Sequence, residues 1–297
     1  MQYVLMDLEW NGGYSKKAHG YFNEIIEVGA VKVGEDGTLL DRFQVQIRPV
    51  VSKKLSGIVT ELTNITAEEL EDGTTFAGMV KKFTRWLGGQ DTVLLTWSTT
   101  DLLVLMENCR FFYGRQEIPF LHNYMDFQAY AQQRMGVGDG QQLGLARAGE
   151  MLDIPEDSFS LHRALDDSIL TARIFEKVYE RKSFLQAIQP VDEEFYRRIT
   201  LKTVIINDID NPLIKRSEMT FNCPECGRSM RRAGQWRFRS RAFCADFTCR
   251  GCDKKYHGRV QFRLKYEGVE TRKKLNEALP PAEEPTGDTQ PAASVEA

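Results

Sequence analysis

The sequence of 297 residues lacks any run of about 20 uncharged apolar residues, the length that a helix needs to cross a bilayer. Its first residues, MQYVLMDLEW, include an acidic pair and no cationic stretch, and no apolar segment of signal-peptide length follows. We therefore expect a soluble, cytoplasmic protein with no membrane partner. The sequence also has no internal repeat. Its 42% hydrophobic and 27% charged residues are typical of globular proteins and not of coiled coils or disordered chains.

Cysteine is scarce in most of the chain. Cys109 stands alone in an apolar helical pattern, which is typical of a buried small side chain. The other five cysteines lie close together near the C-terminus. Without a secretion signal, paired C-x-x-C steps favour metal binding over disulfides. These five residues are Cys223, Cys226, Cys244, Cys249 and Cys252.

The small net charge of −3 conceals three segments of opposite sign. Residues 1–214 carry a net charge of −9, residues 215–274 carry +11, and residues 275–297 carry −5. A basic block joined to an acidic body is typical of a segment that binds a polyanion. A solvated surface without a partner is the alternative interpretation.

Apolar patterning predicts an α/β three-layer domain in the N-terminal part of the chain. Antiparallel strands come first, joined by a turn at 35–38, and alternating strands and helices follow. We expect a mixed five-stranded sheet. The expected strands include 2–8, 24–33, the segment after the turn, 91–97 and 118–127, and the expected helices are 67–87, 101–115, 141–154 and 163–182.

Composition divides the chain into four predicted parts. Residues 1–182 form the α/β domain, 183–214 a helical connector, and 215–274 a small basic unit with the cysteines. Residues 275–297 are rich in Pro, Ala and Glu and contain almost nothing to bury, so we expect a disordered acidic tail.

Two acidic residues share one face of the first predicted strand. Asp7 and Glu9 are two residues apart, so their side chains point the same way while Leu8 points the other way. Paired buried acids repel each other and lose hydration, and a divalent cation would compensate. A strand end that faces water would give the same pattern.

Further acidic candidates follow the fourth strand and open the last helix. Asp101 begins a predicted helix, where an N-cap role is the alternative to metal binding. His162 precedes the last helix, and Asp166 and Asp167 lie in its first turns, where the helix dipole also favours acids. Asp167 is the better candidate ligand, because it falls at the edge of an apolar stripe that includes Leu170.

The order of these motifs resembles the DEDDh branch of the DnaQ-like 3′–5′ exonucleases. D-x-E on the first strand, Asp after the fourth and H-x(4)-D at the last helix match that family, and EIIEVGAVKV and HRALDDSILTA strengthen the match. The stretch around Trp97 is most similar to ERI-type exonucleases, which include a bacterial KapD-like subgroup of predicted sporulation-pathway inhibitors. The resemblance covers about residues 1–180 and implies an RNase H-like fold.

The resemblance implies a two-metal mechanism at a site of four carboxylates. Asp7 would bridge two Mg²⁺ or Mn²⁺ ions, Glu9 and Asp167 would hold the first, and Asp101 would hold the second. Four negative charges balance two divalent ions. His162 would be the general base, since imidazole titrates near neutral pH.

Trp10 departs from the small residue or Thr that relatives carry after D-x-E. It would either stack on the terminal base or pack in the core, and we count it with Trp97 among the candidate nucleic-acid contacts.

Two C-x-x-C pairs predict a Cys₄ zinc ribbon. Cys223 and Cys226 lie in a Pro/Gly turn, and Cys249 and Cys252 repeat the step after 22 intervening residues. One structural Zn²⁺ would organise a segment too short to build its own core. Cys244 is a competing ligand that more simply packs in a strand, and His257 is another.

Basic residues alternate with aromatics between the two pairs, which favours contact with phosphates and stacking on bases. The candidates are Trp236, Arg237, Arg239 and Arg241. A hairpin whose aromatics face its own core, and a protein-binding adaptor, are the alternatives.

Taken together, these patterns predict a metal-dependent exonuclease that shortens single strands from the 3′ end and releases nucleoside monophosphates. RNA is expected over DNA from the ERI-type resemblance alone. A binding or regulatory protein of the sporulation-inhibitor type and an RNase H-fold endonuclease remain as alternatives.

Overall fold

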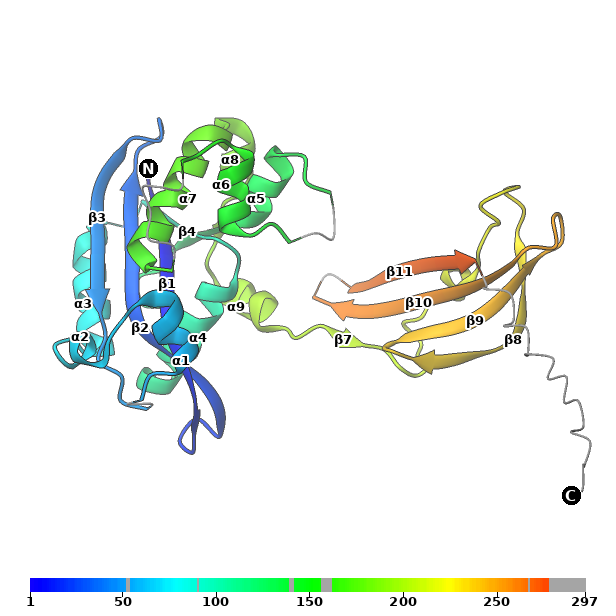
Figure 1. Cartoon of the computed structure of the whole chain (residues 1–297), viewed down its shortest axis with the longest axis horizontal. Coiled ribbons are helices and arrows are strands. Elements are labelled where there is room, and N and C mark those ends of the chain that lie inside the picture. Colours follow the sequence, from blue (N-terminus) through cyan, green and yellow to red (C-terminus); the bar gives the residue numbers. More distant parts are fainter. Residues whose placement is uncertain (52–53, 90, 139–141, 156–161, 267, 278–297) are drawn as a thin grey trace, which may run out of the picture. The chain divides into compact units, whose positions relative to one another are not determined.

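The structure is a computed structural model that divides into two compact units, Met1–Thr200 and Leu201–Ala297 (Figure 1). The first unit extends past the predicted boundary at residue 182, because the helices at 181–187 and 193–200 pack with its cores. Among the described residues, no helix combines the length and the apolar character that a bilayer crossing requires. The described residues are all except 52–53, 90, 139–141, 156–161, 267 and 278–297.

The first unit contains a mixed sheet in the order β3-β2-β1-β4-β5-β6. β1, β2 and β3 pair antiparallel, and β4 and β5 join parallel to β1, as the sequence predicts. A sixth strand, β6, pairs with β5 and comes from the predicted connector. The strands are β1 (Gln2–Ser15), β2 (Gly20–Val33), β3 (Leu39–Gln46), β4 (Thr92–Thr96), β5 (Asn123–Asp126) and β6 (Gln189–Pro190).

Helices cover both faces of this sheet. Alternate residues of β1 enter two separate apolar cores, one with Val4 and the other with Leu5. α3 and α4 contribute to the first core, and α5, α6, α7 and α8 contribute to the second. The helices are α1 (Gly57–Thr63), α2 (Ala67–Glu71), α3 (Phe76–Leu87), α4 (Thr100–Tyr113), α5 (Phe127–Arg134), α6 (Leu145–Met151), α7 (Ala164–Val178), α8 (Arg181–Ala187) and α9 (Glu193–Thr200).

Several predicted elements are shorter than expected, including the helices predicted at 141–154 and 163–182, which are observed as α6 and α7. The predicted helix 67–87 is broken into α2 and α3, because each has its own capping residue, Thr66 and Thr75. The predicted strand 118–127 is reduced to β5, because the Asp126 side chain accepts a hydrogen bond from the Ala129 N–H and starts α5.

The second unit contains a sheet in the order β11-β10-β9-β8, and β7 pairs with β10. Its elements are β7 (Val204–Ile205), the 3₁₀ helix η2 (Arg216–Met219), β8 (Met230–Arg239), β9 (Ala242–Cys249), β10 (Lys255–Lys265) and β11 (Gly268–Glu277).

Three predictions about this unit are corrected. The unit builds an apolar core around Phe247 and Phe262, because its strands are long enough to cover one face. Ile206 and Ile214, which lie in the predicted connector, belong to that core. Residues 275–277, predicted as part of the tail, pair with β10 as the end of β11. The rest of the predicted tail lies outside the described residues.

Candidate active site

The first two acidic residues lie on the central strand of the sheet. Asp7 is paired with Gly29 and Glu9 with Glu27 across β1 and β2. Leu8 points to the opposite face, where it is 2% exposed within the core of α3 and α4. Strand alternation therefore places both carboxylates on one face, as the sequence predicts, and this is the face that α7 covers.

A glycine lets α7 approach these acids. A Cβ atom at Gly29 would lie only 2.1 Å from the backbone of Ala164 and Leu165, so any side chain there would force α7 away from β2. Because Gly29 is the cross-strand neighbour of Asp7, the first turn of α7 lies beside the Asp7 side chain. Asp167 lies in this turn.

Three carboxylates converge as a result. Oxygen atoms of Asp7, Glu9 and Asp167 lie within 4.8 Å of one another. Asp167 is 9% exposed, whereas the neighbouring Asp166 is more exposed. Carboxylate oxygens at this spacing are the donor set that hard divalent cations such as Mg²⁺ prefer, so the residues present fit such an ion.

Asp101 lies next to this group and does not cap its helix. The N-cap residue of α4 is Thr99, and the Asp101 carboxylate instead accepts a hydrogen bond from the Leu8 N–H at 3.2 Å. Asp101 is 5% exposed. It is not one of the three residues whose carboxylate oxygens lie within 4.8 Å of one another. The contact ties the start of α4 to the strand that carries Asp7 and Glu9.

Burial and mutual repulsion raise the pKa of every acid in this cluster. The pKa of Asp7 is raised well above its usual range by burial and then by Asp101 and Asp167. Burial followed by the charge of Asp167 raises the pKa of Glu9 to about 8. Burial is also the main reason why the pKa of Asp101 is raised to about 7 and that of Asp167 to about 6. Cations would relieve this repulsion.

His162 lies at the start of the same helix. Its backbone has a positive φ of 69°, and its N–H donates to the Asp167 carboxylate at 3.2 Å. The residue is exposed, and its charge helps to lower the pKa of Asp167 against the effect of burial. The backbone of His162 therefore lies beside the carboxylates, and its side chain is open to solvent.

Sequence reasoning assigned no role to Glu27, which the structure places at the centre of a buried clamp. Glu27 is 0% exposed, and its carboxylate accepts hydrogen bonds from the Arg163 side chain, from Nη2 at 2.8 Å and Nε at 3.2 Å. The Ala164 N–H and the Gln44 side chain donate to the same carboxylate. A Glu in the otherwise apolar run EIIEVGAV, opposite Glu9, was the signal available in the sequence.

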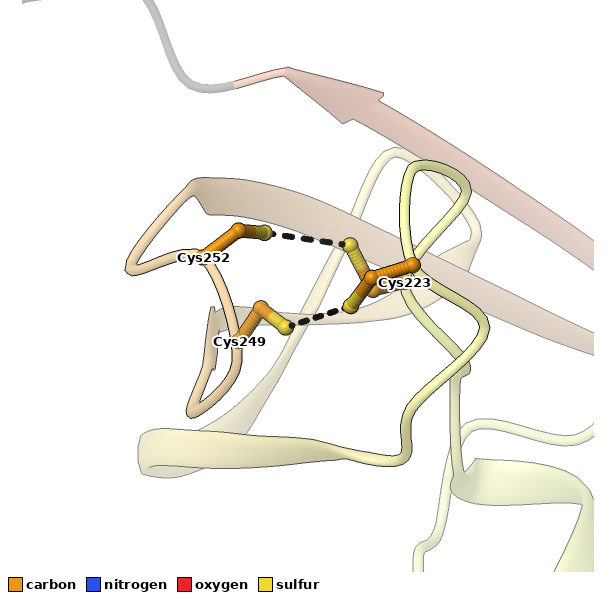
Figure 2. A group of neighbouring side chains, drawn as sticks. Cys223, Cys249 and Cys252 are labelled. Carbon is orange, nitrogen blue, oxygen red and sulfur yellow. Dashed lines mark hydrogen bonds between the residues drawn. The ribbon is translucent and has the colours of Figure 1, made fainter.

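The four cysteines of the two C-x-x-C pairs also converge (Figure 2). Their sulfur atoms lie within 4.8 Å of one another, with Cys223 and Cys252 3.6 Å apart and Cys226 and Cys249 3.4 Å apart. Four thiols at this spacing fit a tetrahedral Zn²⁺. Although burial raises the pKa of Cys223, the N–H groups of its own turn lower it to about 6, so this thiol ionises readily.

The competing candidates lie outside this cluster. Cys244 is buried in β9, with its thiol directed at the carbonyl of Ala242. The His257 ring contacts the Asp246 carboxylate at 2.9 Å. Both residues therefore have partners of their own.

The aromatic candidates differ in exposure. Trp97 is 9% exposed and donates its indole N–H to the Leu143 carbonyl, so it belongs to the core and is withdrawn as a nucleic-acid contact. Trp10 is half-buried against the core of α3 and α4. Trp236 is half-buried against Phe247, with the Arg232 guanidinium 5.8 Å from its ring. The basic candidates Arg237, Arg239 and Arg241 are exposed.

Comparison with known proteins matches the first unit to nucleases. The RNase_T exonuclease family model matches residues 4–175. The probable 3′-5′ exonuclease KapD of Bacillus subtilis is 27% identical over 190 residues, which is 63% of this chain and 89% of that protein. A PolC-type DNA polymerase III of Thermotoga petrophila is 26% identical over 186 residues, which is 60% of this chain but 12% of the polymerase.

Solved structures share the fold. The nuclease domain of 3′hExo, a DEDDh family member bound to rAMP, has a TM-score of 0.53 at 23% identity, covering 64% of this chain and 96% of that domain. A second solved structure describes 3′-end specific recognition of histone mRNA stem-loop by a 3′-exonuclease. It has a TM-score of 0.52 at 21% identity, and the match covers 65% of this chain and 91% of that chain. These likenesses confirm the predicted fold class.

Proposed function

The chain belongs to the RNase_T exonuclease family and is a 3′–5′ exonuclease, and from this premise we propose that it removes nucleoside monophosphates from the 3′ ends of single-stranded RNA. The observation that carries the proposal is the convergence of Asp7, Glu9 and Asp167 within 4.8 Å, with Asp101 tied to the same strand. Such a cluster suits phosphodiester hydrolysis with divalent cations.

We assign the four carboxylates to cation binding. The donor set is all oxygen, and its four negative charges match two Mg²⁺ or Mn²⁺ ions. When bound, the cations would neutralise the carboxylates and stabilise the negative charge that develops on the phosphate oxygens. The rigid strand β1 holds Asp7 and Glu9, while the close packing of α7 on Gly29 holds Asp167 in register with them.

His162 is the proposed general base. A water oxygen would attack the terminal phosphorus while the bond from phosphorus to the O3′ of the preceding nucleotide breaks, and the imidazole would take the proton of that water. The departing O3′ would take a proton from solvent water, so the products are a nucleoside 5′-monophosphate and a strand one nucleotide shorter with a free 3′ hydroxyl. The exposure of His162 and the contact of its backbone with Asp167 support this assignment.

The preference for RNA rests on the ERI-type resemblance of the sequence. It is supported by the fold shared with 3′hExo bound to rAMP and with the 3′-exonuclease that recognises a histone mRNA stem-loop. The carboxylate cluster itself acts at phosphorus and is compatible with either sugar.

We further propose that the second unit binds one structural Zn²⁺ and also binds nucleic acid. The thiols of Cys223, Cys226, Cys249 and Cys252 would hold the zinc. The exposed arginines of β8 and the β8–β9 turn, together with the half-buried Trp236, would contact phosphates and bases. A protein partner at the same surface is the competing proposal.

Digestion of labelled single strands tests the function. A 5′-labelled RNA should shorten in single-nucleotide steps with Mg²⁺ or Mn²⁺, and the Asp7→Asn variant should leave it intact. The matching DNA ranks the two substrates, and a circular strand should survive because it has no 3′ end. Cleavage of the circle would indicate an endonuclease, and intact RNA with both metals would reject the proposed reaction.

A further inference from the structure

The strand that carries the catalytic acids continues well beyond them. β4 pairs with Gln2–Met6 of β1, and β3 pairs with Glu27–Val33 of β2. Among the described strands, the distal parts of β1 and β2 therefore pair only with each other, and they form a two-stranded extension that projects from the sheet in Figure 1. We call residues 12–21 of this extension the hairpin arm.

Two exposed tyrosines lie opposite each other on the hairpin arm. Tyr14 pairs with Tyr21 across the two strands, and the residues are 75% and 68% exposed. The ring of Tyr21 lies over Gly12, where a Cβ atom would come within 2.0 Å of the tyrosine oxygen. Gly12 thus makes room for one ring to lie across the ribbon. Exposed aromatic rings side by side offer a surface on which bases can stack.

The hairpin arm is also a basic segment within an acidic unit. No Asp or Glu occurs from Trp10 to Asn23, where Lys16 and Lys17 are both exposed, although residues 1–214 carry a net charge of −9. Positive charge beside exposed aromatic rings complements the phosphates and bases of a single strand.

Contacts with α4 fix the hairpin arm in place before any substrate binds. Phe22, next to the arm, stacks on Phe111 of α4 with ring centroids 4.5 Å apart. The Lys17 ammonium lies 4.8 Å from the same ring, and the buried Ser15 hydroxyl accepts a hydrogen bond from the Ala18 N–H. An anchored arm loses little entropy on binding, so its contacts count toward affinity.

The distance along β1 sets where a substrate would meet the arm. Tyr14 is five residues beyond Glu9, which corresponds to roughly 17 Å of extended strand. Stacked nucleotides rise about 3.4 Å each, so that span corresponds to about five nucleotides.

We infer that the hairpin arm binds the single-stranded substrate about five nucleotides to the 5′ side of the scissile bond, with bases on Tyr14 and Tyr21 and phosphates near Lys16 and Lys17. This inference rests on the proposed function, because it takes the 3′ end to lie at the carboxylates. It makes the enzyme sensitive to substrate length, since a trinucleotide fills the active site without reaching the arm.

The test compares a 15-nucleotide and a 3-nucleotide RNA with the Y14A/Y21A variant of the full chain. The KM for the 15-mer should rise by roughly 30-fold or more, with kcat within twofold of wild type, because the base stacks on both tyrosines are lost. The KM for the 3-mer should not change. The K16A/K17A variant should weaken binding of the 15-mer and reduce the salt dependence of that binding by about one unit of slope.

Matched controls lie on the same unit. K81A/K82A removes an exposed pair of lysines from α3, and Y113A removes an exposed tyrosine from the end of α4. Both should retain the wild-type KM for each RNA. An equal change in KM for both RNA lengths, or an unchanged KM for the 15-mer in the Y14A/Y21A variant, would overturn the inference.

Direct binding separates this inference from the proposed reaction. If the wild-type protein shortens neither RNA, the proposed function fails, and fluorescence anisotropy of the labelled 15-mer then tests the arm alone. Weaker binding by Y14A/Y21A than by Y113A supports the arm, and equal binding rejects it.

Discussion

Replacing Glu27 by Gln should destabilise the first unit by about 3 kcal/mol. Removal of one partner of a buried ion pair costs roughly 3–5 kcal/mol, because the remaining charge loses its compensation. Arg163 is 24% exposed and keeps some hydration, which places the cost at the lower end of that range. The Glu27 carboxylate accepts hydrogen bonds from Arg163 and from the Ala164 N–H. In Gln, one carboxylate oxygen is replaced by an NH₂ group, which cannot accept these bonds. Release of the repulsion between Glu27 and the neighbouring acid Glu9 acts in the opposite direction and is a smaller effect.

The assay is thermal unfolding of the first unit, followed by circular dichroism without divalent cations. For a unit of about 200 residues, 3 kcal/mol corresponds to a decrease of roughly 6–12 °C in Tm. Glu35→Gln is the matched control on the loop after β2, because its ion pair with Arg181 is exposed and should contribute at most about 1 kcal/mol.

A double-mutant cycle identifies the clamp as the cause. Arg163→Ala should also destabilise the unit, and the double variant should lose less than the two single variants together, by at least about 1 kcal/mol. A change below 1 kcal/mol in Glu27→Gln, or strictly additive effects, would refute the reasoning. Because the clamp fixes the start of α7, which begins two residues after His162, kcat should fall at least tenfold while KM changes little.

Three further outcomes are expected. His162→Ala should lower kcat, measured by RNA digestion, by about 10²–10⁴-fold. Its affinity for Mn²⁺, measured by metal titration, should be retained, and an unchanged kcat would exclude a proton-transfer role. Without cations, Tm should fall as pH rises from about 4 to 8, because the raised folded-state pKa values of Glu9 (about 8), Asp101 (about 7) and Asp167 (about 6) favour the protonated folded protein. Added Mg²⁺ should reduce this fall in Tm, and a Tm that does not change with pH would argue against mutual repulsion among these acids. Cys223→Ser should reduce bound zinc well below one ion per chain by elemental analysis and lower the Tm of the second unit, and a full ion in the variant would reject the four-thiol site.

Much of the fold follows from local patterns in the sequence. The alternating apolar residues of β1 and β2, the turn before β3 and the helical pattern of α7 all predict elements that the structure contains. The two-residue strand β6 had no such pattern, because only its pairing with β5 defines it. The strand β5 was predicted but too long, because the capping side chain of Asp126 determines where it ends. The core of the second unit was missed for a similar reason, since it draws on Ile206 and Ile214 from the predicted connector.

The chemical composition of the site was determined by the sequence alone. The D-x-E spacing on a strand places Asp7 and Glu9 on one face whatever the rest of the chain does, and each C-x-x-C turn brings two thiols together locally. Which of two neighbouring acids, Asp166 or Asp167, points inward also followed from helical periodicity.

Only the tertiary structure decided how these pieces meet. The contact of Asp101 with Leu8 N–H, the close passage of α7 over Gly29 and the clamp of Glu27 on Arg163 join segments that are far apart in the sequence. Such contacts depend on how helices pack on the sheet, and burial in that packing determines the pKa of each acid. Local patterns carry no information on either, because burial is a property of the folded chain and not of any one segment.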